Sequence, residues 1–182
     1  MSSARFLRLG IVVVAAVLAG SIGFALAGSG IDVVVETWID APLDEVYEAL
    51  IAEAEGTTAW GAPHWRAEVR GGLPPDRVGG LMEITVRPSS QDQTVRMMAR
   101  TAEVVPGRLI RFEYIEGDFL GEGVLTLEPE RKGTRVVFRF AARPTSWKLK
   151  VLSPVVKRSH SAAVRAGFAE LERHLGRATT VR

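Results

Sequence analysis

The sequence predicts an α+β domain in which one face of an antiparallel sheet is covered by a single long C-terminal helix. Three patterns indicate this class: a strand that turns directly into an amphipathic helix, a series of alternating strands between residues 64 and 142, and a helical apolar stripe from Val155 to Leu175. Alternation of apolar and polar residues along the strands leaves one face of the sheet exposed to water and the other apolar, or dry. The last helix is the element available to cover the dry face.

The stretch from Ile31 to Leu50 changes its period in the middle. Residues 31–39 alternate as in a half-buried strand, whereas apolar residues from Leu43 onward recur every three or four positions. Pro42 suits a first helical turn, and the two acids that follow Leu43 place negative charge where the helix dipole favours it. A strand therefore runs directly into an amphipathic helix.

The middle of the chain predicts strands separated by glycine and proline turns. They are expected at His64 to Gly71, Leu81 to Arg87, Thr94 to Val104, Leu109 to Glu116, Phe119 to Glu128 and Arg135 to Ala142. Gly121 and Gly123 lie inside one of these patterns, which favours a bulge or a bend there.

The apolar stripe of the last helix is long enough to cross a sheet. Ala163 and Gly167 are small residues on its inward side, which permits close backbone contact or leaves space for a ligand. Gly176 predicts the end of the helix. We expect the domain to occupy residues 31–176, followed by a C-terminal tail at 177–182.

An uncharged segment precedes the domain, within residues 1–30. Residues 9–28 carry no charge and, at about 1.5 Å per residue, span roughly 30 Å as a helix. Its length favours a single-pass membrane anchor. Arg5 and Arg8 then keep the N-terminus cytoplasmic and place the domain outside. The alternative is a secretory signal cleaved near Ala27, with secretion of the domain.

The distribution of charge argues against a nucleic-acid partner and predicts a pairing between an acidic and a basic segment of the chain. Arg5 and Arg8 account for the formal net charge of +2, so the remaining chain is neutral and no nucleic-acid partner is expected. Residues 31–65 contain no Lys or Arg, and residues 131–169 contain no acid. We expect these two segments to face and neutralise each other, or each to form a solvated surface.

The chain resembles the START-related superfamily of lipid-transfer proteins and polyketide cyclases, often abbreviated SRPBCC. The matching residues are Ala41, Pro42, Val46 and Tyr47 at the strand–helix junction, Trp60, Gly61, Pro63, His64 and Trp65 in the aromatic turn, and Gly167, Phe168, Leu171 and Leu175 in the last helix. The resemblance implies a helix-grip fold: a curved antiparallel sheet of about six or seven strands wraps around the C-terminal helix, with a cavity between them.

Catalytic signatures are scarce. The sequence has no cysteine, no pair of histidines at metal-ligand spacing and no nucleotide-binding glycine motif, so we expect neither a metal nor a cofactor. His160 lies near the inward stripe and could titrate near neutrality; Tyr114 lies on a dry strand face and could orient a ligand carbonyl. These two are the candidate acid/base residues, although each could instead serve only in packing.

Ligand-binding residues are expected where aromatic and small side chains face the cavity. The expected set is Trp60, Trp65, Phe112, Tyr114, Phe138, Phe140, His160, Ala163 and Gly167. Trp60 and Trp65 either wall the cavity mouth or belong to the ordinary core.

Three functions remain open at this point. The first is membrane-tethered binding or transport of a hydrophobic small molecule, lipid or polyketide-like, in the internal cavity. The second is a cyclase or dehydratase that uses His160 or Tyr114, and the third is a ligand-free interaction module. The basic segment 143–158 could rest on anionic lipid at about 1 kcal/mol per cation, although a solvated approach to the last helix is the favoured interpretation. The sequence does not indicate the oligomeric state.

Overall fold

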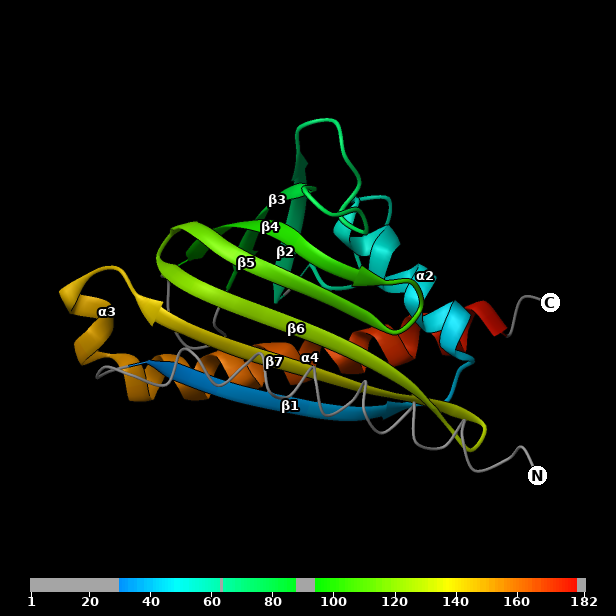
Figure 1. Cartoon of the computed structure of the whole chain (residues 1–182). Helices are drawn as coiled ribbons and strands as arrows, with labels where there is room; N and C mark the ends of the chain where they lie inside the picture. The colour runs from blue at the N-terminus through cyan, green and yellow to red at the C-terminus, as the bar shows by residue number, and fades with distance from the viewer. Residues whose placement is uncertain (1–29, 63, 88–93, 180–182) are drawn as a thin grey trace, which may run out of the picture.

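All seven strands of the described chain form one sheet, in the order β1-β7-β6-β5-β4-β3-β2 (Figure 1). The computed structural model describes residues 30–62, 64–87 and 94–179. The strands are β1 (Ile31–Ile39), β2 (Trp65–Arg70), β3 (Leu81–Val86), β4 (Val95–Val105), β5 (Leu109–Gly117), β6 (Phe119–Glu130) and β7 (Gly133–Pro144). Every neighbouring pair is antiparallel, which confirms the predicted sheet.

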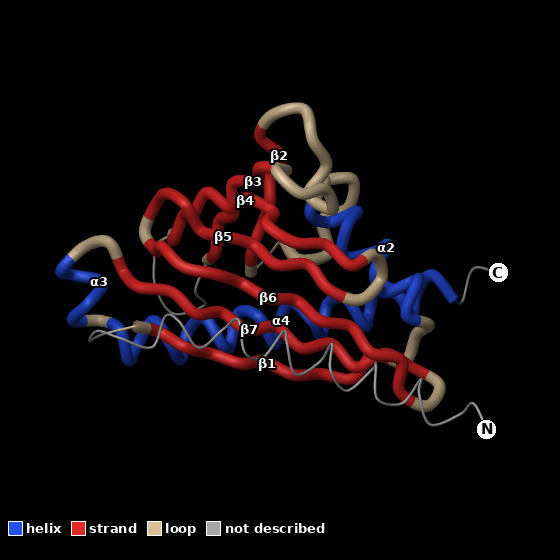
Figure 2. The backbone as a smooth tube through the Cα atoms, viewed as in Figure 1, coloured by secondary structure: helices blue, strands red, loops and turns tan. Residues whose placement is uncertain are grey.

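The sheet curls around α4 (Ser153–Thr179), which forms the helix of the expected helix-grip fold. Figure 2 shows α4 running along β7 and β1, with α3 (Trp147–Val151) at one end and α2 (Leu43–Ala54) towards the other. The core joins the inward face of the sheet to α4, and its members Val35, Phe140 and Leu171 are fully buried. The fold class predicted from the sequence is therefore confirmed.

Ion pairs on the outer face join the acidic and basic segments. Arg139 on β7 binds Asp32 on β1 with nitrogen–oxygen distances of 3.1 and 2.8 Å, and Arg135 binds Glu36 at 2.7 Å. These hydrogen bonds lower the pKa of both carboxyl groups. For β1 and β7, the prediction that the two segments face each other is confirmed. Exposed pairs of this kind stabilise a fold only weakly.

One local prediction is wrong, and of the bulge or bend expected at Gly121 and Gly123 the bulge is absent. The last helix does not end at Gly176 but continues to Thr179, because Arg and Ala beyond the glycine are good helix formers. Gly121 and Gly123 cause no bulge, since the pairing of β6 with both neighbours is uninterrupted. The register shifts lie in the pairing of β4 with β5 instead. Gly121 has a φ of 153°, and a side chain there would collide with the carbonyl oxygen of Ala141 on β7.

The short helix α3 is an element that the sequence did not suggest. Ser146 caps its N-terminus by accepting a hydrogen bond from the Leu149 N–H at 3.3 Å.

The predicted anchor at residues 9–28 and the alternative cleavage site near Ala27 lie outside the described residues. Among the helices within the described ranges, none has both the length and the apolar character required to cross a bilayer.

Candidate functional site

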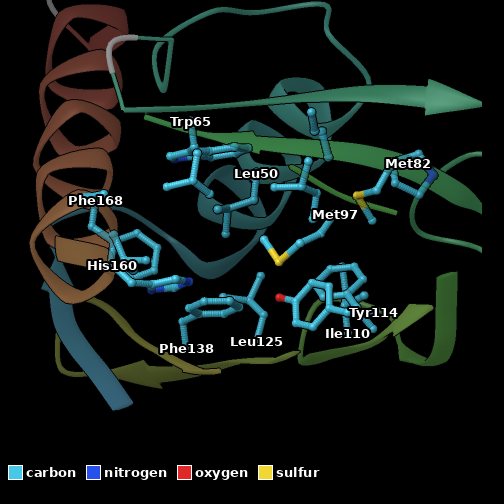
Figure 3. A pocket seen from close by; sticks show the side chains of 18 of the residues that line it. Leu50, Trp65, Met82, Met97, Ile110, Tyr114, Leu125, Phe138, His160 and Phe168 are labelled. Carbon is cyan, nitrogen blue, oxygen red and sulfur yellow. The ribbon is translucent and has the colours of Figure 1, made fainter. Parts of the chain in front are cut away.

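A cavity of about 130 Å³ lies between the curled sheet, α2 and α4 (Figure 3). Its lining is almost entirely apolar, and includes Leu50 on α2, Met97 on β4, Ile110 on β5 and Phe168 on α4. The interior under the last helix is therefore hollow.

Small side chains explain why this space stays open. Ala163 is 1% exposed and Ala67 is 4% exposed, so each fills an inward position of α4 or β2 with only a methyl group. Met82 and Met97 also line the cavity. Methionine side chains are unbranched and flexible, so the shape of the cavity can adapt at these two positions.

Tyr114 on β5 places a hydroxyl group in these apolar surroundings. Its ring packs on Phe140 with centroids 5.3 Å apart, and its oxygen points into the cavity (Figure 3). A side chain at Gly123 on β6 would collide with this oxygen, so the glycine is what lets the tyrosine lie against the sheet. Burial raises the pKa of Tyr114, and the phenol is therefore a hydrogen-bond donor at neutral pH.

His160 on α4 is the second polar group of the lining. Its ring lies 4.2 Å from that of Phe140 and is nearly parallel to that of Phe138, and only 8% of the residue is exposed. Its Nδ1 has no hydrogen-bond partner in the described part of the chain. Burial lowers the pKa of His160 to about 4, so the expectation that it titrates near neutrality is wrong. The imidazole is neutral at pH 7.

The buried His160 predicts a loss of stability in mild acid. Unfolding raises its pKa from about 4 to about 6.5, so below pH 6.5 the unfolded chain takes up the proton more readily. We expect the free energy of unfolding to fall by about 3 kcal/mol as pH drops from about 6.5 to about 4. Urea unfolding across this range measures the slope. His160→Gln should remove most of it, and an equal slope in both proteins would contradict this account of the histidine.

Trp65 at the start of β2 closes one side of the cavity. Its indole lies over the bare backbone of Gly167 on α4, where a Cβ atom would sit 2.6 Å from the indole nitrogen. Trp60 meets Trp65 edge to face with centroids 5.4 Å apart, and donates its indole N–H to the Ala49 carbonyl at 3.2 Å. The sequence left open whether Gly167 permits close backbone contact or leaves space for a ligand. The structure shows close contact, because Trp65 occupies the space beside this glycine.

Glu53 on α2 is a buried carboxylate that the sequence analysis missed. It accepts hydrogen bonds from the backbone N–H groups of Trp60 at 2.9 Å and Gly61 at 3.0 Å, and from the Thr58 hydroxyl at 2.8 Å. These bonds hold the turn that carries the aromatic wall of the cavity. The sequence did contain a signal that Glu53 is buried, because Glu53 lies three positions after Leu50, on the apolar face of the helix.

The structure brings most of the expected ligand-binding residues together. Six line the cavity: Trp65, Phe112, Tyr114, Phe138, His160 and Ala163. Trp60, Phe140 and Gly167 are not part of the lining but support it from behind. The described residues contain no cluster of three or more His, Cys, Asp or Glu side chains that could hold a metal ion.

Comparison with known proteins gives a family match and several fold neighbours. Residues 30–176 match the family model described as polyketide cyclase / dehydrase and lipid transport. A protein from Thermus thermophilus is similar at a TM-score of 0.67 and 23% identity, over 81% of this chain and 98% of the other. The major latex-like protein 151 of Panax ginseng is similar at 0.60 and 11% identity, over 81% and 98%.

A further neighbour is the di-domain ARO/CYC StfQ of the steffimycin biosynthetic pathway, at a TM-score of 0.57 and 18% identity, over 79% of this chain and 50% of the other. At these identities the likenesses show the fold alone. Comparison with curated protein sequences gave no match.

Proposed function

The chain belongs to the polyketide cyclase / dehydrase and lipid transport family, and from this membership we propose that its domain binds a hydrophobic small molecule in the cavity beneath α4. The observation that carries the proposal is the hollow itself, an apolar cavity of about 130 Å³ with two polar groups in its lining. Ligand sites are typically concave and apolar with a few placed polar groups. A ligand-free interaction module would have no need for such an unfilled interior.

The protonation states of the polar groups favour binding over catalysis. A general acid or base works best when its pKa lies near the operating pH. Burial raises the pKa of Tyr114 and lowers that of His160 to about 4, so both groups stay neutral at pH 7. They can donate or accept hydrogen bonds but exchange protons poorly. We therefore place the carrier function ahead of a cyclase or dehydratase activity.

The ligand is a small apolar molecule, or an apolar part of a larger one, that carries a hydrogen-bond acceptor. An engineered cavity of about 150 Å³ in another protein binds benzene, so the space here is of the order of one ring. Rotation of Met82 and Met97 would widen it for larger cargo. Tyr114 supplies the donor for a carbonyl or ether oxygen.

Residues 9–28 tether this binding domain to a membrane in our proposal, with the N-terminus cytoplasmic and the domain outside. Their uncharged sequence supports it, as do the two arginines before them. Cleavage near Ala27 is the alternative, and the intact mass of the mature protein distinguishes the two.

A pair of probe ligands tests the role of Tyr114. We expect acetophenone, a one-ring ketone, to bind more tightly than ethylbenzene, which has a similar shape and no acceptor. Tyr114→Phe should remove this preference, a change of about two- to tenfold in affinity for one neutral hydrogen bond. Calorimetric titration measures both affinities.

The matched control is Tyr47→Phe, because Tyr47 lies on α2 and is not part of the cavity lining. If neither probe binds the wild type, the proposed function is wrong. If the ketone preference survives in Tyr114→Phe, the donor is a different group.

A further inference from the structure

The end of the molecule formed by α3 and the start of α4 exposes apolar side chains. We call residues 147–158 the α3 tip. Trp147 is 70% exposed, Val151 71% and Val155 45%. Three large apolar residues within nine positions are unusual for a surface that meets only water.

Cations surround these apolar side chains. Lys148, Lys150, Lys157 and Arg158 are exposed, and none of them forms an ion pair within the described ranges. Lys157 lies near enough to Asp32 to contribute to its lowered pKa, but that carboxylate is held by Arg139. The α3 tip therefore combines exposed aromatic and aliphatic groups with unneutralised positive charge.

Strand register places the entry of the chain at this same end. Ile31, the first residue of β1, pairs with Ala142, which lies two residues before the end of β7 and five before α3 begins. In Figure 1, β1 starts at the end of the sheet where α3 lies. The uncharged segment 9–28 thus connects to the domain on the side that carries the α3 tip.

We propose that the α3 tip docks on the surface of an anionic bilayer, with Trp147 and Val151 at the headgroup level and the four cations against lipid phosphates. An aromatic and aliphatic face beside lysine and arginine is the pattern of interfacial segments. A tether entering at this end keeps the tip at the membrane. The inference rests on the tethering in the proposed function, but not on what the cavity binds.

The absence of cysteine from the chain allows a site-specific test with the full-length protein. Val151→Cys carries a nitroxide label in the tip. Val105→Cys is the matched control, because Val105 is 44% exposed as the last residue of β4, at the other end of the sheet. Both proteins are reconstituted in phosphatidylcholine vesicles with and without about one third phosphatidylglycerol. Electron paramagnetic resonance then measures the access of oxygen and of a water-soluble nickel complex to each label.

We expect the label at 151 to gain oxygen access and lose nickel access in the anionic vesicles only. Salt at about 1 M should reverse this, because the Debye length falls from about 10 Å at 0.1 M to about 3 Å. When Lys148→Gln and Lys150→Gln are added to the Val151→Cys protein, the label in anionic vesicles should have the same oxygen and nickel access as the label of the Val151→Cys protein in neutral vesicles. The label at 105 should stay accessible to nickel throughout.

Three outcomes overturn the proposal. Flotation on a density gradient shows whether the protein stays with the vesicles. If it does, but the label at 151 remains accessible to the nickel complex in both lipid mixtures, the protein has a membrane tether and no docked α3 tip. If it does not float with the vesicles, it has neither a tether nor a docked tip, and the cavity proposal is unaffected. Spin–spin broadening of the 151 label in both lipids would show a contact between copies of the chain instead of a lipid contact.

Discussion

Replacing Ala163 with phenylalanine is expected to abolish ligand binding. Ala163 is 1% exposed and its methyl group lines the cavity from α4, so a phenyl ring there must occupy the space that a ligand would use. We expect the affinity for acetophenone to fall at least about 100-fold, equivalent to about 2.7 kcal/mol. Calorimetric titration of the variant and the wild type measures the loss.

The neighbouring alanine supplies the control for this variant. Ala162 is exposed on α4 and is not part of the cavity lining, so Ala162→Phe should bind the probe as the wild type does. Overpacking a core costs about 1–3 kcal/mol, so thermal unfolding must show that Ala163→Phe is folded. Ala163→Ile is a smaller second variant with an intermediate expected effect. Wild-type affinity in a folded Ala163→Phe would mean that the ligand binds elsewhere.

Replacing Glu53 with alanine is expected to cause the largest loss of stability. The substitution removes the acceptor of the backbone N–H groups of Trp60 and Gly61 in a buried turn. An unsatisfied buried donor costs about 1–3 kcal/mol, so we expect the free energy of unfolding to fall by about 2–5 kcal/mol. Urea unfolding measures this change. Ligand affinity should fall as well, because the same turn carries the aromatic wall of the cavity.

Glu55→Ala is the matched control, since Glu55 is exposed just beyond the same helix. It should change stability by less than about 0.5 kcal/mol. Glu53→Gln retains one carbonyl acceptor and should lie between the two. Equal stability of Glu53→Ala and Glu55→Ala would contradict the role assigned to the buried carboxylate.

Most of the fold was predictable because it depends on periodic burial. Alternation along β5, β6 and β7 and the three-to-four spacing along α4 each fix which side of an element meets the core, and these are local properties of the sequence. The end of α4 was not predictable from Gly176, because a glycine inside a helix costs only about 1 kcal/mol relative to alanine. The helix α3 is too short to show a period.

The site was predictable only in part. Tyr114 and His160 lie on inward faces, so the sequence could place them near the cavity. It could not give the protonation of His160, because that depends on how completely Phe138 and Phe140 exclude water from the imidazole. The sequence likewise could not separate Gly123, which makes room for the Tyr114 hydroxyl, from a glycine at a bulge.

The family resemblance implied a cavity, but its extent cannot be derived from the residues alone, because it depends on how the side chains of many elements pack against one another. Ala163 is small enough to leave space, but Gly167 is smaller still and its space is filled by Trp65. Only the three-dimensional positions of the partners distinguish the two cases.

Native mass spectrometry of the full-length wild type and Ala163→Phe, each released from mild detergent, tests most directly whether the cavity holds an apolar guest. We predict that the wild type carries a non-covalently bound small molecule at one copy per chain, and that Ala163→Phe carries none. A wild type at its bare polypeptide mass even after incubation with a lipid extract, or the same adduct on both proteins, would contradict the proposal.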